Sequence, residues 1–486
     1  MDSIVAEQIE APTSAPVPTL TSDVETATSA NSPEPMTQRR VLGLAFPIIG
    51  ENLLQTAVSA VNTFMVARLG AAAVAGVGIG FEVVFLIISV LSAIDVGATV
   101  LVAQSIGAGD KQRADLFARQ AIVWGVLLSI PVSVLMYFAA PVIVGLFGTE
   151  PEVASAATIY LEIVAATSIS LFMSFVAGAV LRGAGDSHTP LAASLIANIV
   201  NVIVNYLLIF GQFGLPTLGV AGAAWGATIG RGCGAIFMLV LMIAGKRAIS
   251  MRGTWGWRPD VSRARELFRL GLPAAAEQVL SSGGFTTLIA VVALIGTSAL
   301  AAQQIAFTAL SLAFLPGVGF SITATALVGQ SIGARSPQNA RRAWQISLRW
   351  AFAWMGIGAV LVFFLSERLM RIFSSDPEVI ATGATALRAL SFALPWWAIW
   401  FVSSGSLRGS GDTRTPLIFG ATSIWLAVLL GWVGVKWFDA GIGWVWFAFV
   451  LTTGPVAIIA WWSFRKRLME YDTGHRELPA VTPSPA

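Results

Sequence analysis

Two stretches of the chain decide its fold: LRGAGDSHTPL at residues 181–191 and LRGSGDTRTPL at residues 407–417. They are identical at eight of eleven positions and lie 226 residues apart. The same spacing relates QSIGA at 104–108 to QSIGA at 330–334. A constant spacing between unrelated motifs indicates a duplicated unit without net insertion, so the sequence predicts two homologous halves.

The composition is that of a membrane protein. Hydrophobic residues make up 56% of the 486 residues and charged residues 11%, whereas soluble domains carry about 25% charged residues. The apolar runs are long and do not alternate, which predicts helices and excludes a barrel. Two histidines and one cysteine are too few for a catalytic triad, a His/Cys metal site or a disulfide framework. We therefore expect no enzyme and no cofactor.

Twelve apolar segments are long enough to cross a bilayer, which takes about 20 residues each. Six spans per half is an even number, so both halves enter the membrane from the same side as parallel repeats. The predicted fold is an all-α membrane protein with twelve transmembrane helices in two pseudo-symmetric six-helix lobes. The expected spans are 41–67, 72–103, 117–147, 153–181, 190–211, 218–244, 267–295, 299–329, 343–373, 379–406, 416–436 and 441–464.

Lysine and arginine gather in the loops of one side, which predicts that both termini are cytoplasmic. The opposite turns are short and acidic, as in GTEPE and SSDPE. No transit-like segment is visible, so we expect a multi-pass protein of a bacterial plasma (inner) membrane, and a monomer. The expected parts are a disordered tail 1–36, an N-lobe 37–244, a cytoplasmic linker 245–266, a C-lobe 267–467 and a disordered tail 468–486.

Acidic side chains inside the spans are candidates for ion coupling, because a carboxylate at membrane depth must pair, bind a cation or take up a proton. Glu51 and Glu277 are repeat mates, each four residues after a proline, and pseudo-symmetry predicts that they face each other across the lobe boundary. Asp95 lies deep in the second span. The alternative is structural: a polar group that stabilises a proline-kinked helix, or a protonated side chain bonded to nearby hydroxyls.

The sequence resembles the multidrug and toxic compound extrusion (MATE) family over about 41–465. The paired RGxGDxxTPL loops, the two QSIGA segments and NIVNVIVNYLLIFG at 198–211 carry the resemblance. The resemblance implies export of organic cations, coupled to inward H⁺ or Na⁺, by rocking of two lobes around a central cavity.

Asparagines concentrate in the first half, where the resemblance implies an ion or proton site. The candidate lining residues are Asn62, Asn198, Asn201 and Asn205. The resemblance implies that the position of Asn62 is often Asp in the family and that the position of Asn205 is Asp in one of its branches. A carboxamide can bind Na⁺ or substrate but cannot carry a proton, so we expect coupling at Glu277, Glu51 or Asp95.

Three tryptophans lie inside the tenth span beside Pro395: Trp396, Trp397 and Trp400. Because aromatic faces attract organic cations, these side chains are candidates for the wall of an apolar cavity. The alternative is lipid exposure or core packing.

Glu162 and Arg388 are repeat mates of opposite sign, which suggests an interlobe gate, or else local pairing within each lobe. Arg231 lies within the sixth span, where we expect it to pair with an acid or with helix-end carbonyls.

These features predict a secondary active antiporter for small amphipathic, cationic compounds, with the lipid bilayer but no nucleic acid as partner. Two other classes remain open. A lipid-linked saccharide flippase of the same superfamily would use a positively charged cavity, and a receptor or scaffold would move nothing.

Overall fold

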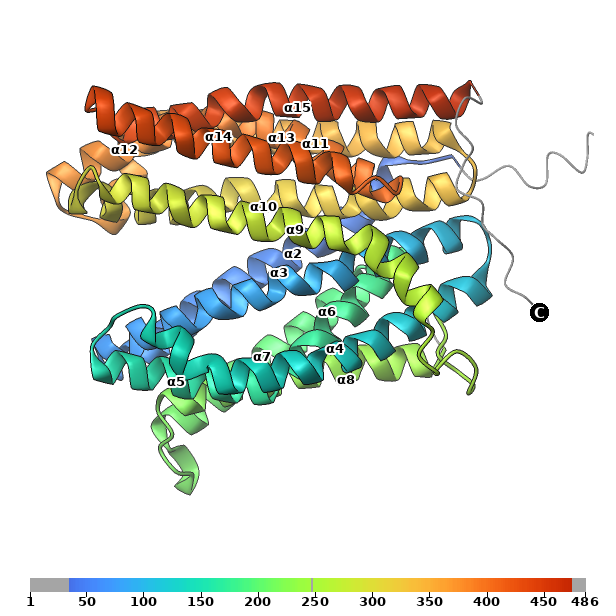
Figure 1. Ribbon diagram of the computed structural model, residues 1–486, viewed down its shortest axis with the longest axis horizontal. Coiled ribbons are helices and arrows are strands. Elements are labelled where there is room, and N and C mark those ends of the chain that lie inside the picture. Colours follow the sequence, from blue (N-terminus) through green and yellow to red (C-terminus); the bar gives the residue numbers. More distant parts are fainter. Residues whose placement is uncertain (1–34, 246–247, 474–486) are drawn as a thin grey trace, which may run out of the picture. The chain divides into compact units, whose positions relative to one another are not determined.

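The computed structural model describes residues 35–245 and 248–473. In the first half, the helices are α2 (Gln38–Ala67), α3 (Ala71–Gly107), α4 (Lys111–Gly145), α5 (Pro151–Ala166), α6 (Ser168–Gly183), α7 (His188–Phe210) and α8 (Val220–Ile243), with a short 3₁₀ turn η1 (Gln212–Gly214). In the second half, they are α9 (Val261–Ala293), α10 (Thr297–Gly333), α11 (Pro337–Phe373), α12 (Pro377–Ser391), α13 (Ala393–Gly409), α14 (Arg414–Phe438) and α15 (Ile442–Asp472) (Figure 1).

The membrane spans agree with the predicted number. Ten helices are long and apolar enough to cross a bilayer, and two bent helix pairs bring the number in the described residues to twelve. The fourth and tenth spans, however, are not the continuous helices that the sequence predicted. The chain bends by 58° between α5 and α6 and by 46° between α12 and α13. At the first bend, the Thr167 hydroxyl donates to the Ile163 carbonyl, so this carbonyl has a side-chain hydrogen-bond partner at the break.

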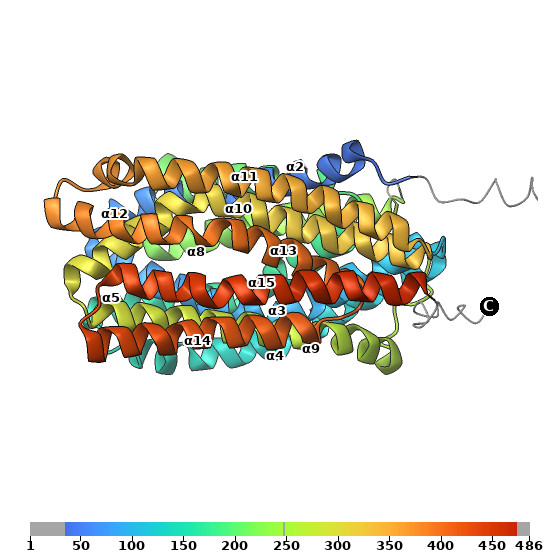
Figure 2. The same ribbon diagram turned by 90° about the horizontal axis from the view of Figure 1, so that it is seen from above.

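Buried apolar side chains form two separate cores, one in each half of the chain. The first helix of each half contributes to both. The start of α2, including Val41 and Ile48, packs into the second core, whereas Val66 near its end packs into the first. In the same way, Leu267 near the start of α9 packs into the first core and Leu288 into the second. Figure 2 shows α9 running beside α14, and α3 crossing near α9. The two first helices therefore join the lobes.

Two predicted boundaries are wrong. The linker was predicted to reach residue 266, but α9 begins at Val261 because the side chain of Asp260 accepts from the Ser262 and Arg263 amides. The C-terminal tail was predicted from residue 468, but α15 continues to Asp472, which pairs with Arg341 at 2.8 Å. The predicted N-terminal tail, apart from residues 35 and 36, and residues 474–486 lie outside the described residues.

Candidate functional site

A cavity of about 510 Å³ lies inside the first half, between α2, α3, α5, α6, α7 and α8. Most of its wall is apolar or aromatic, with Phe81, Phe85 and Tyr160 among the lining residues. The structure brings several residues singled out by the sequence to this one cavity: Glu51, Asn62, Asn198, Asn201, Asn205 and Arg231. Broad apolar walls with few polar groups are typical of small-molecule sites.

The asparagines form the polar wall near α7. The Asn205 amide donates to the Asn62 carboxamide oxygen at 2.9 Å. Both Asn201 and Asn205 are buried, and neither side-chain oxygen accepts a hydrogen bond from a described residue. Gly226 allows this packing, since a Cβ there would lie 1.9 Å from the Asn205 oxygen. Two buried oxygens thus lack a donor, which makes them acceptors for a cation or a ligand donor.

Glu51 pairs with the arginine of the RGxGD loop in its own half. The Arg182 guanidinium lies 3.4 Å from the Glu51 carboxylate and 3.6 Å from the Asp95 carboxylate. It fits because Gly178, one turn earlier, has no side chain; a Cβ there would lie 3.0 Å from the guanidinium. Two carboxylates therefore share one arginine, which can balance the charge of only one of them when both are ionised.

The C-lobe repeats half of this arrangement. Arg408 donates to Glu277 at 2.7 Å, and Glu277 is buried with its second carboxylate oxygen unpaired among the described residues. The repeat mate of Asp95 is Ser321, whose hydroxyl donates to the Phe401 carbonyl instead. In each half, the glutamate thus pairs with the arginine of its own RGxGD loop, and the prediction that Glu51 and Glu277 face each other stays a prediction. Within the described residues, no three His, Cys, Asp or Glu side chains gather as a metal site requires.

The aspartates of the RGxGD loops shape the next helix. Asp186 accepts from the Thr189 amide at 3.0 Å and its hydroxyl at 2.6 Å, and Asp412 makes the same two bonds with Thr415. These side chains hold the starts of α7 and α14, which is a structural role.

The three tryptophans of α13 do not share one wall. Trp397 is buried and packs edge-on against Phe314 and Phe449. Trp396 lines a separate apolar groove of about 640 Å³ between α11, α12 and α13. Trp400 approaches Glu277, since both would contact a Cβ at Gly420. Of the three, only Trp400 therefore lies beside a candidate coupling residue.

The predicted gate pair is not formed in this conformation. Arg388 donates to Glu367 of α11 at 2.9 Å, within its own half of the chain. Glu162 has no ion pair with a residue of the described ranges. An interlobe contact between Glu162 and Arg388 stays a prediction for another conformation.

The two lobes meet at the end of the bundle that carries the QSIGA and RGxGD segments, here called the motif end. Gln104 donates to the Gly409 carbonyl at 3.1 Å, and its repeat mate Gln330 donates to the Gly183 carbonyl at 3.0 Å. Each glutamine thus reaches from one lobe to the other. Gln330 also accepts from Arg40 at 3.0 Å. We call the two glutamines and their carbonyl partners the glutamine clasp. It was not predicted from the sequence, although both copies of QSIGA contain the glutamine.

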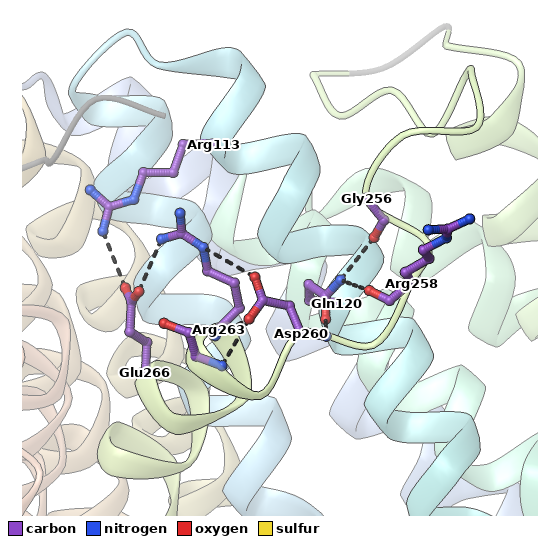
Figure 3. Close-up of polar contacts among 8 residues, drawn as sticks. Arg113, Gln120, Gly256, Arg258, Asp260, Arg263 and Glu266 are labelled. Atoms are coloured by element: carbon purple, nitrogen blue, oxygen red, sulfur yellow. Dashed lines mark hydrogen bonds and ion pairs between the residues drawn. The ribbon is translucent and has the colours of Figure 1, made fainter. Parts of the chain in front are cut away.

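The segment between the lobes is held by α4. The Arg119 guanidinium donates to three carbonyls, those of Ser250, Arg252 and Trp255. Gln120 donates to the carbonyls of Gly256 and Arg258 and accepts from the Asp260 amide (Figure 3). In the same view, Glu266 of α9 lies between Arg113 and Arg263. Residues 250–260 of the linker are therefore fixed to the N-lobe.

Two parallel six-span repeats, the first of which encloses a cavity, define a class of membrane protein, the two-lobed secondary transporters. The MatE family profile matches residues 47–207 and 273–433, two segments related by the 226-residue spacing of the repeat. A probable multidrug resistance protein NorM of Thermotoga maritima is 31% identical over 426 residues, 86% of this chain and 89% of that protein. The chain therefore belongs to the MATE family.

Other comparisons agree with this assignment. An uncharacterized transporter of Bacillus subtilis, YisQ, is 26% identical over 88% of this chain and 94% of its own length. The outward-facing structure of a multidrug resistance MATE family transporter has a TM-score of 0.84 at 21% identity and covers 89% of this chain and 96% of that chain. These relatives are transport proteins, not enzymes.

Proposed function

We propose that the chain is a secondary active antiporter that exports amphipathic, cationic compounds in exchange for H⁺ or Na⁺. The names of the NorM relatives support multidrug efflux. The observation that carries the coupling is the group of two carboxylates, Glu51 and Asp95, around the single Arg182. Its unbalanced negative charge is what a proton, a sodium ion or a cationic substrate would neutralise, and only one of them at a time.

Competition for that charge gives the mechanism. An ion from outside occupies the carboxylate and releases the substrate, and the lobes then rock so that the site faces inward. Glu277 would bind an ion in the same way in the C-lobe. Asn62, Asn198, Asn201 and Asn205 would orient the ligand, and Trp400 would flank the C-lobe acid. Glu162 and Arg388 would meet when the outer mouth closes.

The motif end faces the cytoplasm in this proposal. Both ends of the described helices lie there: the Met36 amide donates to Asn339, and Asp472 pairs with Arg341. The arginine-rich loops of the same end support that orientation. We place the protein as a monomer in a bacterial plasma membrane.

The test is dye flux in proteoliposomes under a pH gradient or a Na⁺ gradient, applied separately. Transport of an ethidium-like cation under one gradient, lost in Glu277→Gln and in Glu51→Gln, would support the proposal and identify the ion. Glu378→Gln is the matched control, because Glu378 is an exposed acid outside the cavity. Flux that survives both site variants would move the coupling to Asp95, and absence of flux under either gradient would overturn the antiport.

A flippase for lipid-linked saccharides is the second candidate, because Arg231 lines the cavity. Arg388, the other arginine singled out from the sequence, pairs with Glu367 and adds no positive charge to the cavity. Gradient-independent movement of a lipid-linked saccharide across the same vesicles would favour it.

A further inference from the structure

Arg231 is the one basic lining residue of the N-lobe cavity, and it pairs with no acid in the described part of the chain. It lies in the middle of α8, and its side chain borders the cavity. No carboxylate in residues 35–245 or 248–473 lies within 4.0 Å of it, and no carbonyl there accepts a hydrogen bond from it. The pairing expected from the sequence is therefore absent. Ionisable groups at membrane depth border aqueous cavities and mark substrate paths.

Two residues of opposite charge border the cavity, and they lie at different levels along α7. Glu51 and Arg231 are the two lining residues that are charged at neutral pH. Glu51 lies near the start of α7, because the adjacent Gly50 approaches Leu191. Arg231 lies further along, because the adjacent Gly230 packs against Ala197. These two contacts on α7 are six residues apart, or about 9 Å along the helix axis.

We propose that Arg231 binds an anionic group of the transported compound, a carboxylate, sulfonate or phosphate, so that the cavity favours zwitterions over simple cations. This rests on the proposed efflux function, since it names the substrate class. The carboxylate group around Arg182 attracts the cationic part of the compound, and the guanidinium attracts the anionic part. A guanidinium suits this role because its planar donors match both oxygens of a carboxylate.

The C-lobe supports the assignment by contrast. The repeat mate of Arg231 is Ala457, which is fully buried. The mates of Asn62 and Asn201 are Leu288 and Ala427, which are also fully buried. At these three positions the C-lobe therefore buries apolar side chains where the N-lobe places polar ones on its cavity. An arginine that served only the architecture of the lobe would have no reason to appear in one copy alone and to border the empty space.

The experiment compares two dyes that differ in one group. Rhodamine 110 carries a free carboxylate, and rhodamine 123 is its methyl ester. We would measure binding of each to the purified full-length protein by fluorescence anisotropy at one fixed, low ionic strength. The variants are Arg231→Gln, which removes the charge, and Arg231→Lys, which keeps it. Arg349→Gln is the control: Arg349 is exposed on α11, and its substitution removes the same charge from the chain.

The wild type and the Arg349→Gln control should bind rhodamine 110 more tightly than rhodamine 123. Arg231→Gln should weaken rhodamine 110 by roughly tenfold or more, the loss expected for a hydrogen bond to a charged group, and should leave rhodamine 123 unchanged. Arg231→Lys should keep part of the preference. Equal weakening of both dyes, a wild-type preference for the ester, or no binding of either dye would overturn the proposal.

Flux measurements keep this result separate from the efflux function. A binding preference that depends on Arg231, without gradient-driven flux of either dye, would support the anion site and overturn the antiport. Gradient-driven flux of both dyes, together with equal binding affinities, would support the antiport and overturn the anion site.

Discussion

Loss of the glutamine clasp should open the motif end, and it should do so unequally for the two glutamines. Gln104→Ala removes one neutral hydrogen bond, to the Gly409 carbonyl. Gln330→Ala removes the equivalent bond to the Gly183 carbonyl and also the bond from the Arg40 guanidinium. A neutral hydrogen bond contributes about 0.5–1.5 kcal/mol, and one to a charged group about 1.5–3 kcal/mol.

These values give the size of each effect. Gln104→Ala should cost the closed motif end about 1 kcal/mol, or roughly a fivefold shift in its population relative to the open form. Gln330→Ala should cost about 2–4 kcal/mol, which is a shift of roughly 30-fold or more. Pseudo-symmetry alone would predict equal effects, so the difference between the two variants tests the additional arginine contact.

The population can be measured by electron–electron double resonance between spin labels on the two lobes. Lys111→Cys and Arg414→Cys place labels on exposed residues at the starts of α4 and α14, in a Cys233→Ala background that removes the native thiol. Gln304→Ala is the control, an exposed glutamine of α10. The reasoning is refuted if Gln330→Ala leaves the distance distribution unchanged, or if Gln104→Ala shifts it as much.

Two further predictions concern the contact between α3 and α9 and the attachment of the linker to α4. Gly271→Ala should destabilise the closed motif end by about 1–3 kcal/mol, as overpacking does, because the new Cβ would lie 1.5 Å from the Ala93 carbonyl oxygen. The spin-label distances would report this change, and an unchanged distance distribution would contradict it. Gly43→Ala is the control, because a Cβ at Gly43 would meet no atom within 4 Å. Arg119→Ala should release the linker, because three linker carbonyls lose a charged hydrogen-bond donor. The measurement is the rate of proteolysis at residues 250–258, with Lys111→Ala as the control variant. Faster cleavage in Arg119→Ala than in the control would confirm the prediction, and equal rates would count against it.

Much of the fold could be predicted because hydropathy and the repeat are properties of the sequence itself. The number of spans and the correspondence of the halves follow from them. The bend at Thr167 did not, because no proline or glycine marks that break and the apolar run continues through it. The bend at Phe392 was missed although Pro395, three residues further on, removes a helical hydrogen bond at this break. Boundaries were also misplaced where a polar side chain extends a helix beyond the apolar segment, as Asp260 does for α9.

Of the site, the positions were easier to predict than the partners. The asparagines of α7 lie on the cavity because residues one turn apart share a face. The ion pair between Glu51 and Arg182 was missed, although its signal was present: a glutamate and an arginine 131 residues apart recur in both halves. The tryptophans were harder, because adjacent residues of a helix point about 100° apart. Trp396 and Trp397 therefore face different surroundings, a groove and the core.

The duplication separates two roles that a single lobe would have to combine. Both copies keep the elements that join the lobes and hold the loops: the glutamine, the RGxGD arginine and the glutamate that pairs with it. They differ where the N-lobe has a cavity and the C-lobe has a core. There, Gly431 replaces Asn205, and a Cβ at Gly431 would lie within 3.7 Å of Leu288, the mate of Asn62. A symmetric frame can rock as a unit, whereas recognition of an asymmetric compound needs polar groups in one place. In the proposed mechanism, the shared residues join the lobes, with Glu51 also on the cavity wall, and the unshared Asn62, Asn201, Asn205 and Arg231 recognise the compound.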